Sequence, residues 1–138
     1  MQRLIVSLIF TAAILRTDPV LVTHVTDGDS ITVATIGGVR LLGIEASSLR
    51  ARERLESLVY RRWIRLEYDE AAGERPSKHR AYVVLDTGEF VNATLVREGL
   101  ARVVARGEFS RRAELERAQA EAQRFQRGIW ARYTRARP

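Results

Sequence analysis

The chain has 138 residues, and 46% of them are apolar, which fits one globular domain and excludes a disordered tail. It has no cysteine, so a disulfide framework and a cysteine-ligated metal site are both excluded. The formal net charge is +6, and Lys78 is the only lysine among 23 basic residues. Arginine forks suit phosphate, but a GC-rich genome also favours arginine codons, so the charge alone leaves nucleic-acid binding open.

The chain opens with an apolar stretch over residues 4–15, directly after Met1-Gln2-Arg3. A basic start and an apolar core of this kind are typical of a secretory signal, and a spanning helix needs roughly 20 apolar residues. We assign residues 1–17 to a signal peptide or anchor, with no other membrane segment, and expect export (secreted, periplasmic or membrane-anchored) rather than a cytoplasmic location. An extra strand or helix of the domain is the alternative. The domain itself is expected over residues 18–131, as a monomer, with a basic tail over residues 132–138.

Alternating apolar and β-branched residues predict strands over residues 20–26, 30–35 and 39–44, separated by glycine-containing turns. A helical period follows over residues 49–63, with Leu55, Leu58, Val59 and Trp63 on one face. Strands over residues 64–68 and 80–85 flank a polar loop. A helix over residues 91–98 stops at Gly99, and Ser110 is placed to cap a last helix that stops at Gly128. Short strands that must hide their edges favour a small closed barrel.

Four segments carry a resemblance to a known family. They are VTDGDSITV (25–33), VRLLGIEA (39–46), FVNATLVREGLARV (90–103) and RGIW (127–130). In this order and spacing they resemble the staphylococcal nuclease (thermonuclease) family, over nearly all of residues 20–130. The resemblance implies an α+β, mainly β fold: a five-stranded OB-fold barrel with three helices.

Members of that family hydrolyse phosphodiesters with Ca²⁺ on two carboxylates, a glutamate near the attacking water and two arginines on the phosphate. Position by position, the resemblance places the metal carboxylates at Asp29 and Glu45 and the first arginine at Arg40. The second arginine falls on Lys78, for which Arg80, two residues on, is a substrate-binding substitute. The glutamate falls on Ser48, whose hydroxyl is no general base at neutral pH without a basic neighbour.

Two functions therefore stay open. One is a calcium-dependent endonuclease on DNA or RNA, single-stranded substrates included, with an incomplete site. The other is a catalytically silent OB-type domain that binds nucleic acid or protein; Ser48 favours it, whereas export favours the nuclease. The site residues also have plain structural alternatives: Asp29 closing a turn, Arg40 a solvated strand charge, Glu45 capping the following helix and Lys78 an ordinary loop residue.

Overall fold

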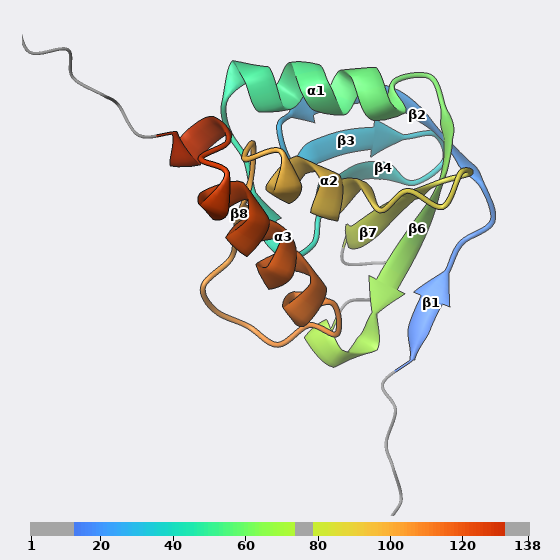
Figure 1. Ribbon diagram of the computed structural model, residues 1–138. Coiled ribbons are helices and arrows are strands. Elements are labelled where there is room, and N and C mark those ends of the chain that lie inside the picture. The colour runs from blue at the N-terminus through green and yellow to red at the C-terminus, as the bar shows by residue number, and fades with distance from the viewer. Residues whose placement is uncertain (1–12, 74–78, 132–138) are drawn as a thin grey trace, which may run out of the picture.

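Five strands close into a barrel in the computed structural model, which describes residues 13–73 and 79–131 (Figure 1). The strands are β2 (Val20–Asp27), β3 (Ser30–Val33), β4 (Gly37–Leu41), β6 (Trp63–Asp69) and β7 (Arg80–Leu85). They pair in the order β6-β2-β3-β4-β7, and the pairing of β6 with β7 closes the ring. Only the β4–β7 pairing among these is parallel. The predicted OB-type barrel is confirmed, and each strand lies within a few residues of its expected position.

A short strand, β1 (Ile14–Arg16), extends the sheet beyond the barrel by pairing antiparallel with β6. The backbone N–H of Thr17 donates to the carbonyl of Leu66 at 2.9 Å, which continues this edge. The expected boundary between residues 17 and 18 thus falls after a strand of the fold. Residues 1–12, which hold most of the predicted leader, lie outside the described residues. No helix in the described ranges is long and apolar enough to cross a membrane.

Three α-helices cover the barrel: α1 (Leu49–Val59), α2 (Val91–Arg97) and α3 (Arg112–Arg124). Two 3₁₀ turns, η1 (Glu70–Ala72) and η3 (Gly128–Trp130), complete the fold together with the two-residue strands β5 (Ile44–Glu45) and β8 (Arg102–Val103). Figure 1 shows α1 across one end of the barrel and α3 beside α2.

Helix α1 ends earlier than its apolar period predicted. Arg61 has a left-handed φ of 56°, which no helix interior accommodates, so the chain turns there. Trp63 consequently starts β6 and is 60% exposed, instead of lying on the buried face of the helix.

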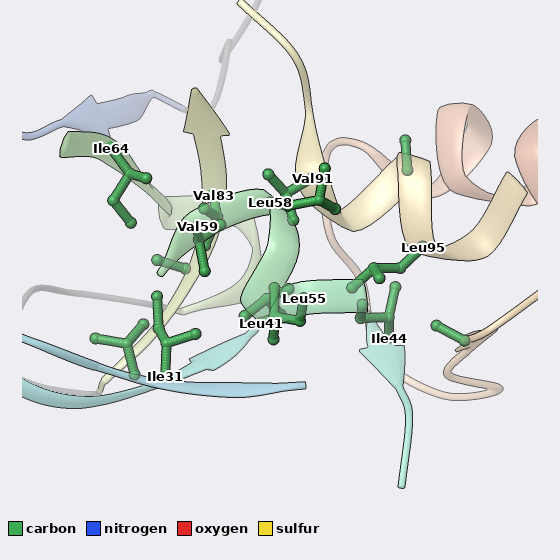
Figure 2. Packing of buried hydrophobic residues seen from close by; sticks show 14 of the residues in the cluster. Ile31, Leu41, Ile44, Leu55, Leu58, Val59, Ile64, Val83, Val91 and Leu95 are labelled. Atoms are coloured by element: carbon green, nitrogen blue, oxygen red, sulfur yellow. The ribbon is translucent and has the colours of Figure 1, made fainter. Parts of the chain in front are cut away.

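The hydrophobic core lies between the barrel strands and the helices α1 and α2 (Figure 2). Leu55 and Val59 of α1 are fully buried there, together with Val83 of β7 and Leu95 of α2. Burial of an aliphatic side chain of this size stabilises the fold by about 1.5–3 kcal/mol. The apolar face of α1 and the inward-facing residues of the barrel strands thus pack together in one cluster.

Asn92 joins α2 to the barrel, which gives the Val-Asn motif a structural reason. Its side chain is fully buried, accepts from the N–H of Val83 at 3.0 Å and donates to the carbonyl of Leu42 at 2.9 Å. A buried amide whose oxygen and nitrogen both have partners fixes the position of α2 relative to β7 and the end of β4.

The two glycine motifs near the C-terminus, GLA and RGIW, lie against each other. Gly99 and Gly128 both have positive φ, and the N–H of Ile129 donates to the carbonyl of Gly99 at 2.9 Å. A side chain on either glycine would collide with the backbone of the other segment. The C-terminal 3₁₀ turn is therefore held beside the end of α2.

Asp69 is the most completely satisfied charged group of the interior. It is fully buried, and it accepts from the Tyr82 hydroxyl at 2.7 Å and from the N–H and hydroxyl of Ser110 at 2.6 and 2.8 Å. The N–H of Ala71 donates to it as well. The prediction that Ser110 caps the last helix is wrong, because its side chain binds Asp69 and α3 starts after Arg111 without a side-chain cap.

We predict that Asp69→Asn lowers the free energy of unfolding at neutral pH by about 2–4 kcal/mol, since hydrogen bonds to charged groups contribute about 1.5–3 kcal/mol each. Burial raises the pKa of Asp69, but the hydrogen bonds from Tyr82, Ser110 and Ala71 outweigh it, and the pKa lies below its ordinary value. A lowered folded-state pKa gives stability that is present above the unfolded value, about 3.9, and is lost as pH falls through the folded value.

Urea unfolding between pH 2 and pH 7 measures the free energy of unfolding of wild type and Asp69→Asn as a function of pH. The wild type should lose stability below about pH 4, and Asp69→Asn should show a shallower acid limb. The control is Asp86→Asn, in an exposed turn. Equal pH dependence of wild type and Asp69→Asn would contradict the assignment.

Candidate active-site cleft

An open cleft of about 600 Å³ lies between the end of β4, strand β5 and the segment that follows β8. Strands β5 and β8 pair antiparallel, with Glu45 opposite Arg102, and this small sheet forms one wall. The charged side chains around the cleft come from five separate segments of the chain. They are Asp27, Asp29, Arg40, Glu45, Arg80, Arg102, Arg106 and Glu108.

Asp29 is held firmly at the cleft. The residue is only 4% exposed, and Oδ2 accepts from the N–H of Ala46 at 3.1 Å while Oδ1 accepts from the Ser30 hydroxyl at 3.1 Å. Nε of Arg40 lies 4.0 Å from Oδ1. The turn itself is closed by Asp27, whose Oδ1 accepts from the N–H of Gly28 at 2.7 Å. Asp29 is therefore a residue of the cleft and not merely the closing residue of a turn.

Gly28 lets this turn lie directly against the chain before α1. A Cβ at position 28 would lie 2.9 Å from the carbonyl oxygen of Ala46 and 2.8 Å from Cβ of Ala51. Only a glycine permits so close an approach, and that approach is what brings the Asp29 carboxylate to the N–H of Ala46.

The structure assigns the helix cap to Ser48 and places the Glu45 side chain in the cleft. Glu45 is exposed at the cleft and makes no hydrogen bond or ion pair with the described part of the chain. The helix cap is Ser48, whose Oγ accepts from the N–H of Ala51 at 3.1 Å. The interpretation of Glu45 as a cap is wrong, and its carboxylate is available to a ligand.

The two arginines of the barrel stand next to each other. Strands β4 and β7 pair in parallel with Arg40 opposite Arg80, and both side chains line the cleft. The side chain of Arg40 is 59% exposed. Lys78, the position that the resemblance assigns to the second arginine, lies outside the described residues. Arg80 is the second basic residue that the structure brings to Arg40.

Sequence reasoning missed four charged residues of the cleft: Asp27, Arg102, Arg106 and Glu108. Asp27 was assigned only to a turn. Arg102 stands inside the GLARV segment, where its exposed place opposite Glu45 depends on the β5–β8 pairing. Two-residue strands carry too little alternation to be recognised from sequence.

Three of the four carboxylates that line the cleft, from Asp27, Asp29 and Glu45, lie at or close in sequence to the expected metal positions, and carboxylates bind hard divalent cations. Across residues 13–73 and 79–131, no three acidic, histidine or cysteine side chains are already close enough together to hold a metal. Each Asp29 oxygen has one side-chain or backbone donor and so keeps a lone pair, while both Glu45 oxygens keep theirs. These groups fit part of the shell of Ca²⁺, whose 6–8 oxygen ligands regularly include carbonyls and water.

Comparison with known proteins bears on this cleft. A family described as "Staphylococcal nuclease homologue" matches residues 39–132, which include Arg40, Glu45, Ser48 and Arg80. The thermonuclease of Staphylococcus hyicus is 29% identical over 126 residues, covering 80% of this chain and 74% of that protein.

We predict that Gly28→Ala destabilises the fold by about 1–3 kcal/mol, the usual cost of overpacking, because its Cβ overlaps the backbone at Ala46. The matched control is Gly38→Ala, since no described atom lies within 4 Å of a Cβ there and its φ is not positive. Thermal unfolding followed by circular dichroism compares the two variants. Equal melting temperatures for the two variants would show that the fold does not depend on the close approach of Gly28 to Ala46.

Proposed function

Because this chain belongs to the staphylococcal nuclease family, we propose that it is a Ca²⁺-dependent phosphodiesterase acting on DNA or RNA, with slow turnover. The observation that supports the proposal is the common cleft of Asp29, Glu45, Arg40 and Arg80. Carboxylates for a cation and arginines for a phosphate are the groups that phosphodiester hydrolysis requires in one place.

Arg40 and Arg80 bind the phosphate in this proposal. They are neighbours across the β4–β7 pair, so two guanidinium groups face the same space from adjacent strands. A guanidinium stays charged at every physiological pH and matches two phosphate oxygens with parallel N–H donors. The pair would orient the phosphate and stabilise the charge that grows on it during attack.

Asp29 and Glu45 would hold the cation, which when bound neutralises phosphate charge and lowers the barrier to attack by water. Asp29 contributes a fixed carboxylate because Ala46 and Ser30 orient it. Glu45 contributes an adjustable one, because it has no partner in the described ranges. Calcium tolerates such uneven and flexible oxygen geometry.

The slow turnover follows from position 48. The Ser48 hydroxyl accepts from the N–H of Ala51, so it is engaged in the helix cap and supplies no base to a water molecule. A positioned general base contributes about 10²–10⁴-fold in rate. Binding and charge stabilisation without that base support a correspondingly weaker nuclease.

A binding role without cleavage is the second candidate function, and the capping role of Ser48 is the observation that favours it. The same arginines would then retain a nucleic-acid strand without hydrolysing it. The two functions differ in the products formed, not in the residues that contact phosphate, so one set of variants tests both.

We predict that Ser48→Glu raises Ca²⁺-dependent cleavage of single-stranded DNA at least about tenfold, because it returns a carboxylate to the cleft. The substitution also removes the cap, at about 1 kcal/mol of stability, and Ser48→Ala is the matched control for that loss. Ser47→Glu adds a carboxylate to the same cleft without touching the cap. Asp29→Asn should abolish the cleavage that Ca²⁺ supports.

Cleavage of a fluorescent oligonucleotide, with Ca²⁺ and with chelator, measures these rates. Fast Ca²⁺-dependent cleavage by wild type that Ser48→Glu leaves unchanged would show that another group activates the water. Absence of cleavage from every variant, with oligonucleotide binding retained, would establish the binding function instead.

We predict that Arg80→Ala lowers cleavage and binding more than Lys78→Ala does, because Arg80 lines the cleft beside Arg40. Loss of one donor to a transition-state charge typically costs about 10²–10³-fold in rate. Each variant removes one positive charge, so a difference between them does not come from the change in net charge. A larger effect at position 78 would restore the role that the family resemblance gives to Lys78.

A further inference from the structure

We propose that Arg102, supported by the ring of Trp130, is a nucleobase-binding residue of the cleft. This inference deepens the proposed function and rests on it for the class of ligand. It concerns the wall of the cleft formed by β8, a different strand pair from the one that carries Arg40 and Arg80.

The guanidinium of Arg102 lies over the indole of Trp130, with Cζ 5.0 Å from the ring centroid. Arg102 lines the cleft, whereas Trp130 is not among its lining residues. The exposed side chain of Arg102 is therefore in contact with the indole and also accessible to a ligand in the cleft.

The position of Arg102 is fixed from two directions. The β5–β8 pairing sets its backbone opposite Glu45, and the contact of Gly99 with Gly128 and Ile129 brings η3, which carries Trp130, to the same wall. Arg102 forms no ion pair with the described residues, although Glu45 is its cross-strand neighbour. Its guanidinium is thus held against the indole and not neutralised by a carboxylate.

The surroundings of Arg102 suit a base better than a second phosphate. Leu100, Val104 and Ile129 line the cleft next to it, and Ile129 is 40% exposed. Exposed aliphatic surface beside a guanidinium plane offers contact to a flat, weakly polar ring. Arginine planes stack on unpaired bases in proteins that bind single strands, whereas the bases of a duplex are already stacked on each other.

The test is binding of two eight-residue, phosphorothioate-linked oligonucleotides in the presence of Ca²⁺: oligothymidylate, and the same backbone with abasic units. The linkage resists hydrolysis, so the result does not depend on whether the chain cleaves DNA. Wild type should bind the base-containing strand more tightly than the abasic one.

Arg102→Ala and Arg102→Lys should both weaken binding of the base-containing strand about 5- to 150-fold, because stacking of one base contributes about 1–3 kcal/mol. Arg102→Lys keeps the charge but loses the plane, so it should leave binding of the abasic strand nearly unchanged. Arg117→Ala, on the exposed face of α3 and outside the cleft, is the control for loss of one positive charge.

Three results would overturn the proposal. They are equal wild-type affinity for the two strands, full binding by Arg102→Lys, which would make the residue a phosphate contact, and equal effects of Arg102→Ala and Arg117→Ala. Circular dichroism spectra of all variants confirm that they are folded. Failure of cleavage with ordinary DNA, by contrast, would count against the nuclease function and leave this base contact standing.

Discussion

The approach of the Asp27–Asp29 turn to the backbone at Ala46 is the contact on which the cleft depends. Asp29 takes part in it twice: its carbonyl accepts from the N–H of Leu41 at 2.8 Å, and its carboxylate accepts from the N–H of Ala46 at 3.1 Å. The first bond belongs to the closed barrel, and the second ties the barrel to the segment that leads into α1. Gly28 makes the second bond possible because any side chain there would meet Ala46.

This double attachment gives Asp29 a structural role in addition to any role with a cation. A buried carboxylate that loses its donors costs free energy, and donors that lose their carboxylate cost free energy as well. A change at position 29 therefore acts on the barrel and on the cleft together. Glu45 differs in this respect: its side chain is exposed and has no partner within the described ranges, so a change there should affect the cleft more than the barrel.

Ser48 shows how helix formation and catalysis compete for one position. Only three residues separate Glu45 from Leu49, the first residue of α1, so position 48 is the N-cap by geometry. A hydroxyl there satisfies one of the free N–H groups of the first turn and is worth about 1 kcal/mol. A glutamate at position 48 would give up this hydroxyl cap in exchange for a carboxylate at the cleft, which Ser48 lines.

Much of the fold could be predicted from the sequence because barrel strands and amphipathic helices have strong periods. The barrel strands and the helix around Leu55 follow alternation and a 3.6-residue stripe, and the nuclease family follows from motifs with fixed spacing. Contacts between distant segments were not predictable. The turn at Arg61 that follows α1, the Ser110–Asp69 bonds and the β5–β8 pair each depend on a tertiary neighbour that no local pattern encodes.

The cleft was predictable in the same uneven way. The resemblance indicated Asp29, Arg40 and Glu45, and these lie around one space, while their roles in catalysis stay predictions. The choice between Lys78 and Arg80 depended on strand register, and the parallel β4–β7 pair places Arg80 next to Arg40. Arg102 escaped notice because its importance arises from Trp130, which is far away in sequence.

The charge of the cleft links cation binding to nucleic-acid binding. Among the described residues, four arginines and four carboxylates line it, so without a cation the formal charge of these lining residues is balanced. A polyanion gains little from a balanced surface, because attraction to each guanidinium is offset by repulsion from a nearby carboxylate. One bound divalent ion changes that balance by two charges at the carboxylates themselves. By linkage, a nucleic-acid strand that binds more tightly with the ion present must tighten binding of the ion to the same degree.

A base contact at Arg102 carries no such dependence, since stacking on a planar group is mainly a contact of surfaces. The proposed site would thus hold its substrate through two separable interactions, one that requires the cation and one that requires an unpaired base.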